Sequence, residues 1–173
     1  GIEEQFRKIN GQEVSLIVYT TAIRNEAGEI AAVLKMATDI TEIKLLQNQL
    51  RESRERYRYL FEEVPCYITV QDRDLRIIEA NRRFREDFGE VAGSQCYEVY
   101  MHRSEACVPC AVKETFQDGL VHQTEEVVTS RSGEQMNVLV STTPIRGAEG
   151  QIRSVIEMST NITPIRQLQS QLT

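Results

Sequence analysis

The chain has 173 residues, a net charge of −6 at pH 7 and a hydrophobic content of 40%. This hydrophobic content suffices for a buried core, whereas the acidic balance argues against a general nucleic-acid surface, which would be basic. No apolar run approaches the ~20 residues of a membrane span, and no basic-then-apolar signal segment opens the sequence. We therefore expect a cytoplasmic location, no nucleic-acid partner and no membrane segment in this stretch.

Residues near the start of the chain recur near its end at a constant offset of 122 positions, without a gap. The offset places Asp39-Ile40-Thr41 on Asn161-Ile162-Thr163, and it superposes roughly the first 50 residues on the last 50. An ungapped repeat of this kind predicts two copies of one structural unit. Each copy should end in the same strand-to-helix exit.

Residues 1–40 are expected to form strands, including a hairpin between 13–21 and 30–38 that turns at Gly28. In the second of these strands the apolar alternation puts one set of side chains on one face: Ile30, Ala32, Leu34, Met36 and Thr38. Three strands at most are too few to bury a core, so residues 1–40 are interpreted as the second half of a unit whose first half is missing here. The apolar face should then pack on another chain, including by swapping, or on the helix 43–64.

A long helix is expected after the first exit, capped by Thr41; at the second exit Thr163 caps and Pro164 occupies the first helical position. The apolar residues then follow the 4-3 spacing of a coiled-coil seam with one polar break: Ile43, Leu46, Leu50, Ser53, Tyr57, Leu60 and Val64. Residues 41–60 are interpreted as a linker or signalling helix, with a homodimer through helix 43–64. The alternative is a packing helix of the next domain.

A second unit should begin near Arg54, with Pro65 ending the long helix. Strands are expected at 66–71 and 76–80, and a short helix capped by Asn81 should end at Gly89. Short helices and loops over 91–118 precede strands at roughly 121–131, 134–146 and 150–160. Residues 164–173 should begin an exit helix.

That order of elements, carried by three motifs, resembles the PAS family of sensory domains. The motifs are Tyr57-Arg58-Tyr59-Leu60-Phe61-Glu62 at the entry, Ile78-Glu79-Ala80-Asn81 before the first helix, and the strand pair 138–145 and 152–160. Residues 54–163 match a complete domain, and 1–40 match the C-terminal half of another. Asp39-Ile40-Thr41 resembles the family's exit motif, in which Asn161 replaces the usual acid in the second copy.

The resemblance implies an α+β fold: a PAS-like five-stranded antiparallel sheet with short helices on one face, a cavity between them, and long coiled-coil-type helices on the flanks. It also implies a downstream output domain of the same chain, such as a histidine kinase. The sequence contains no glycine-rich nucleotide loop and no Ser/His/Asp or paired-carboxylate arrangement. This stretch itself is therefore not expected to be an enzyme.

Three cysteines, Cys96, Cys107 and Cys110, fall in the helical region that would cover the cavity. The stretch from Cys107 to Cys110 is expected to open a helix running to Phe116, where unpaired N–H groups would lower the thiol pKa. Three interpretations stay open: inert buried thiols, a reversible dithiol/disulfide switch, or a zinc or iron–sulfur site. The metal site would need Cys66 or His102 as a fourth ligand.

Other cofactors find less support. Gly93-Ser94-Gln95-Cys96 is similar to the flavin-adduct motif of light-sensing family members, but Tyr97 and Tyr100 stand where that motif has arginine and glutamine. Cys110 lacks the following histidine of a c-type haem attachment, and both histidines fall at loop or strand-start positions.

Two functions follow from this reading. One is a sensory module that detects a ligand or a redox change and relays it through rigid exits at Asp39, Thr41, Asn161 and Thr163. In that case Ser53 would weaken the helix seam locally and make it bistable. The other is a structural dimerisation and spacer module without a ligand.

Overall fold

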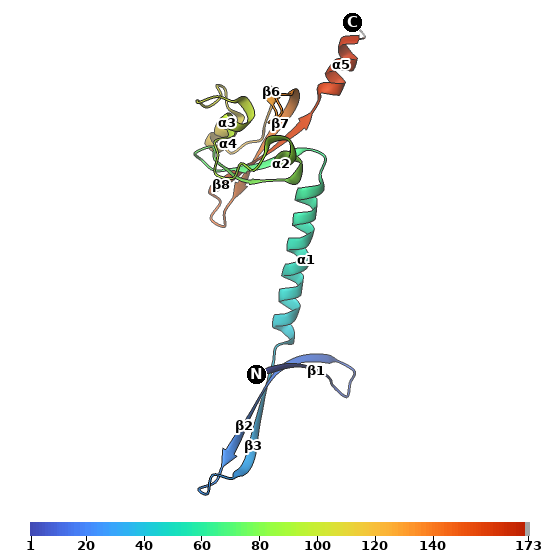
Figure 1. Ribbon diagram of the computed structural model, residues 1–173, viewed down its shortest axis with the longest axis vertical. Helices are drawn as coiled ribbons and strands as arrows, with labels where there is room; N and C mark the ends of the chain where they lie inside the picture. Colours follow the sequence, from blue (N-terminus) through green and yellow to red (C-terminus); the bar gives the residue numbers. More distant parts are fainter. Residues whose placement is uncertain (172–173) are drawn as a thin grey trace. The chain divides into compact units, whose positions relative to one another are not determined.

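The computed structural model describes residues 1–171 (Figure 1). The chain divides into two units, Gly1–Tyr57 and Arg58–Thr173. Among the described residues, no helix is long and apolar enough to cross a membrane.

The first unit is a small antiparallel sheet followed by most of a helix. Its strands are β1 (Ile2–Arg7), β2 (Glu13–Arg24) and β3 (Ile30–Asp39), in the order β1-β2-β3. Every residue of β3 is exposed. The helix α1 (Thr41–Glu63) has no buried residue, so the expectation that helix 43–64 covers the apolar sheet face is wrong. Its polar and charged flanks leave no wide apolar stripe to pack on a sheet.

The second unit is a five-stranded antiparallel sheet with three short helices on one face (Figure 1). The strand order is β5-β4-β8-β7-β6, which makes β8 the central strand. The elements are β4 (Tyr67–Gln71), β5 (Ile77–Ala80), α2 (Arg82–Phe88), α3 (Cys96–Met101), α4 (Ala111–Asp118), β6 (His122–Thr129), β7 (Gln135–Arg146), β8 (Ile152–Asn161) and α5 (Thr163–Gln171). The α+β prediction is thereby confirmed for the sheet and the short helices. Of the long flanking helices, α1 is present with 23 residues, but the described residues form no coiled coil.

The sequence repeat corresponds to a structural repeat. Strands β2 and β7, and likewise β3 and β8, begin and end at residues that differ by the same 122 positions. Both hairpins shift register at equivalent places, Ile23/Arg24 and Ile145/Arg146. The first unit therefore has counterparts of β6, β7 and β8, and it lacks counterparts of β4, β5 and the short helices.

The two exits share two equivalent hydrogen bonds, and the first exit has a further one from the Thr41 hydroxyl to Asp39 Oδ1 (2.6 Å). The Thr163 N–H donates to Asn161 Oδ1 (2.9 Å), and the Asn137 N–H donates to the Thr163 hydroxyl (2.9 Å). At the first exit the Thr41 N–H donates to Asp39 Oδ1 (2.9 Å), and the Ser15 N–H donates to the Thr41 hydroxyl (3.0 Å). The predicted helix-capping role of both threonines is therefore wrong, because each hydroxyl joins the helix start to the neighbouring strand.

An ion pair ties each exit helix to the sheet. Lys44 of α1 pairs with Glu3 of β1, and Arg166 of α5 pairs with Glu125 of β6. Neither pair uses Asp39 or Asn161. The exchange of acid for amide at the second exit consequently leaves this anchor intact.

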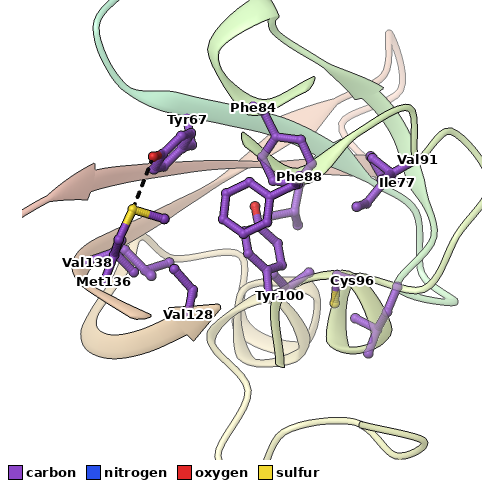
Figure 2. Packing of buried hydrophobic residues seen from close by; sticks show 14 residues of the cluster. Tyr67, Ile77, Phe84, Phe88, Val91, Cys96, Tyr100, Val128, Met136 and Val138 are labelled. Carbon is purple, nitrogen blue, oxygen red and sulfur yellow. Dashed lines mark hydrogen bonds between the residues drawn. The ribbon is translucent and has the colours of Figure 1, made fainter. Parts of the chain in front are cut away.

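Aromatic side chains form the core between the short helices and the sheet (Figure 2). Phe84 and Phe88 of α2 stack at 4.7 Å between ring centroids, and Tyr100 of α3 packs edge-on against Phe84 at 5.2 Å. Asn81 caps α2 as predicted, accepting from the Phe84 N–H. Gly89 ends α2 with φ of 92°, a value that favours glycine. This packing fixes α3, and with it one wall of the site described next.

Candidate functional site

The three cysteines of the C-x10-C-x2-C motif come together around one cavity. Cys96 is the first residue of α3, Cys110 is the N-cap of α4, and Cys107 lies in the loop before it. The expected helix from Cys107 to Phe116 is thus shorter at its start, beginning only at Ala111. The cavity measures about 30 Å³, room for one or two water molecules. It is lined by Cys96, Tyr97, Tyr100, Met101, Cys107, Cys110, Ala111, Val112, Glu126, Val128, Val140, Glu157 and Ser159.

The two residues considered as a fourth metal ligand lie elsewhere. Cys66 precedes β4, and its carbonyl accepts from the Asn81 side-chain amide (2.9 Å). His102 places Nε2 at 3.2 Å from the Thr129 carbonyl oxygen. Neither lines the cavity, and residues 1–171 hold no group of three or more His, Cys, Asp or Glu side chains suited to a metal ion. All four cysteines are free thiols.

Burial controls the chemistry of these thiols. It raises the pKa of Cys96, Cys107 and Cys110 above the ordinary thiol value. At Cys110 the N–H groups of Val112 and Lys113 lower the pKa as the helix-terminus argument predicts, but desolvation outweighs them. The predicted thiolate is therefore wrong, and the resting cysteines are protonated and weakly nucleophilic.

A buried carboxyl group, Glu157, lies on the central strand beside the thiols. Only 8% of the residue is exposed, and burial raises its pKa from 4.5 to about 7. The hydroxyl of Tyr100 and the amide of Gln71 favour the carboxylate, and nearby Glu126 opposes it. Burial also raises the pKa of Glu126. The cavity thus contains two carboxyl groups whose charge is costly.

A hydrogen-bond network supports Glu157. Gln71 Nε2 donates to Glu157 Oε2 (3.1 Å) and to the Thr69 hydroxyl (3.2 Å), and Thr69 shares a hydrogen bond with the Tyr100 hydroxyl (3.2 Å). Among the residues that the structure describes, three buried side-chain oxygens have no hydrogen-bond partner, Gln71 Oε1, Gln95 Oε1 and Ser159 Oγ, and of these three residues only Ser159 lines the cavity. Ser159 lies close enough to Glu157 to favour its charged form, but without hydrogen-bond geometry. Buried polar atoms without partners are uncommon and mark sites where a ligand or ordered water belongs.

A wider groove of about 520 Å³ adjoins the cavity along β6. Met101, Cys107, Ala111 and Glu126 line both spaces. The groove therefore lies next to the cavity, with these four residues between the two spaces.

Sequence reasoning missed Glu157, Gln71 and Ser159. The alternation in the first copy favoured the face carrying Leu34 and Met36, whose equivalents Ile156 and Met158 point away from the cavity. Glu157 and Ser159 occupy the other face of β8, together with the fully buried Val155. The sequence signal that could have identified Glu157 is its position two residues after Val155, because alternation in a strand puts both side chains on the same, buried face.

Comparison with known families assigns the fold. Residues 61–167 match the family described as PAS fold. The chain belongs to the PAS fold family. The matched range contains the whole five-stranded PAS sheet, its short helices and the cavity.

Known proteins similar to this PAS chain include a two-component sensor and isolated PAS domains. The two-component sensor PprA of Pseudomonas aeruginosa is 24% identical over 99% of this chain, which spans only 19% of that sensor. The PAS domain of an HTR-like protein from Haloarcula marismortui is 25% identical, with a TM-score of 0.57, over 69% of this chain and 99% of that one. A PAS domain from Colwellia psychrerythraea, 17% identical with a TM-score of 0.55 over 64% of this chain and 97% of that one, shares the fold.

Proposed function

We propose that this PAS chain is a cytoplasmic sensory module that detects a small ligand, or oxidation of its cysteines, in the cavity. The signal would pass through the exit helix to an output domain, a histidine kinase in our proposal. Family membership and the likeness to a two-component sensor support this reading. The cavity supports a ligand more strongly than a dithiol switch, because its thiols are protonated at rest.

The position of β8 carries the proposal. This strand is central in the sheet, contributes Glu157 and Ser159 to the cavity, and ends at Asn161. Asn161 and the neighbouring strand β7 then hold the first residue of α5 through Thr163. A change at Glu157 or Ser159 is therefore only a few residues of strand away from the exit helix.

Hydrogen exchange at the second exit tests this coupling. The Ile162 N–H donates to the Asn137 carbonyl (2.8 Å), so its exchange rate reports the strand-to-helix junction. We expect a cavity ligand, found by screening small molecules of different charge, or the dithiol oxidant diamide, to change protection of residues 161–166 about tenfold, near 1.4 kcal/mol.

Thr163→Val removes the hydroxyl that links α5 to β7 and serves as the matched variant. It should bind the same ligand and lose most of the response at the exit. If no ligand and no diamide treatment changed the exchange protection of residues 161–166 in the unmodified chain, the result would contradict the sensory proposal and favour the spacer function.

We also propose a homodimer through α1. The apolar seam residues Ile43, Leu46, Leu50, Tyr57 and Leu60 are each 55 to 58% exposed. Their 4-3 spacing matches a two-stranded coiled coil. A partner helix would bury this stripe, which explains an otherwise costly row of exposed leucines.

Leu50→Glu should weaken this dimer at least tenfold in sedimentation equilibrium, because it places two like charges in an apolar seam. Asn48→Glu, on the side of the helix opposite the seam, is the matched control and should leave the dimer unchanged. A monomeric unmodified chain at ~100 µM, well above the Kd of a specific dimer, would refute the proposed interface.

A further inference from the structure

We propose that the cavity binds a small aliphatic amine, with the ammonium head group held by Glu157 and Ser159. This inference rests on the sensory function proposed above and specifies the chemical class of its ligand. It follows from the charge of the lining, from its hydrogen-bond acceptors and from the sizes of the two adjoining spaces.

The charge of the cavity favours a cation. Its thirteen lining residues include two carboxyl groups, Glu126 and Glu157, and no lysine, arginine or histidine. An anionic ligand would face both carboxyl groups in a low-dielectric site, where the cation that acts on Glu126 is Arg103, a residue of the groove and not of the cavity lining. An ammonium group would instead compensate the buried negative charge.

The unsatisfied polar atoms favour a hydrogen-bond donor. Ser159 is 1% exposed, lines the cavity, and its hydroxyl has no partner. Glu157 accepts a hydrogen bond from Gln71, and the hydroxyls of Tyr100 and Ser159 also favour its charged form. A carboxylate can take about four hydrogen bonds, which leaves acceptor capacity. An ammonium group brings three N–H donors and no acceptor. It therefore matches a site in which Ser159 and Glu157 have unused acceptor capacity.

The remaining lining of the inner cavity is apolar and aromatic around the head group. Val112, Val128 and Val140 provide apolar contact, and the rings of Tyr97 and Tyr100 border the same space. Aromatic rings attract ammonium groups through their π faces, more strongly where water is excluded. Neutral donors such as alcohols would gain the hydrogen bonds without this attraction or the charge compensation.

The two spaces set the shape of the ligand. The inner cavity of about 30 Å³ admits little more than a head group, whereas the outer groove of about 520 Å³ accommodates a chain. Glu126 lines both, and Glu114 and Glu125 line the groove, which also contains Arg103 and His122. A linear amine would reach inward past Glu126, whereas Glu125 is paired with Arg166 and Glu114 lies beside His122.

Titration calorimetry with three ligands of the same length tests the proposal: n-butylamine, n-butanol and butyrate. We expect the amine to bind at least tenfold more tightly than the alcohol and butyrate not to bind. Glu157→Gln, which keeps the shape and removes the charge, should weaken amine binding at least tenfold. Ser159→Ala should weaken it severalfold.

Glu149→Gln is the matched control, because Glu149 is an exposed acid in the turn between β7 and β8; it should bind the amine as the unmodified chain does. Unchanged amine binding in folded Glu157→Gln, checked by circular dichroism, would overturn the proposal. Tighter binding of butanol or butyrate would also overturn the amine assignment and leave the sensory function standing. The sensory function itself would be contradicted by a different result: no change in exchange at residues 161–166 with any cavity ligand or with diamide.

Discussion

Asn81→Ala should lower the free energy of unfolding by roughly 3 kcal/mol, since it leaves buried polar groups unpaired and removes a helix cap. Asn81 is fully buried. Its Oδ1 accepts from the N–H groups of Ile68 (3.0 Å) and Phe84 (3.2 Å), and its Nδ2 donates to the Cys66 carbonyl (2.9 Å). One side chain thus joins the start of α2 to β4.

Urea denaturation followed by circular dichroism measures this loss. Asn81→Asp keeps the acceptor oxygen, but it loses the donor to Cys66 and buries a carboxyl group against that carbonyl, so it should also destabilise the fold. Asn48→Ala, on the exposed surface of α1, should change stability by less than ~0.5 kcal/mol. An alanine variant at position 81 as stable as the unmodified chain would show that Asn81 does not hold α2 on the sheet.

Glu157→Gln should remove a pH dependence of stability that the unmodified chain shows between pH 4.5 and 7. The folded protein raises the Glu157 pKa from 4.5 to about 7, so the native state binds a proton that the unfolded state has released. Stability is therefore highest below pH 4.5, as far as this group is concerned, and falls as the pH rises through 7. The difference of about 2.5 pKa units corresponds to roughly 3 kcal/mol.

Denaturation midpoints at pH 5, 6, 7 and 8 test the prediction. The unmodified chain and Glu149→Gln should lose stability over this range, and Glu157→Gln should lose much less. A weaker slope should remain in the variant because burial also raises the Glu126 pKa, in the same direction. If stability changed with pH equally in the unmodified chain and in Glu157→Gln, Glu157 would have the same pKa in the folded protein as in water.

Much of the architecture could be predicted because it depends on local chemistry. The repeat fixed the equivalence of β2 with β7 and of β3 with β8, down to the same terminal residues. Asn81 and Gly89 marked the ends of α2 through residue-specific backbone and capping preferences. These preferences depend on only a few neighbouring residues, so they can be recognised in the sequence without knowledge of the tertiary contacts.

Other predictions failed where a distant partner decided the outcome. Thr41 and Thr163 have side chains suited to helix capping. Their hydroxyls instead accept hydrogen bonds from the N–H groups of strand residues 26 positions earlier, Ser15 and Asn137. Cys110 does lie at a helix N-terminus, yet desolvation by the surrounding fold reverses the direction of its pKa shift. In both cases the local preference exists and the tertiary environment is stronger.

The sequence by itself determined that the chain carries an ungapped internal repeat and one complete PAS unit, where the paired strands and the two exits lie, and which three cysteines share a region. Only the tertiary structure decided which chemistry that region has. It places Glu157 of β8, Gln71 of β4 and Tyr100 of α3 in one buried network, although they are separated by up to 86 positions. Burial, which raises the pKa of both Glu157 and Tyr100, is a property of the whole packed unit and not of any segment of the chain.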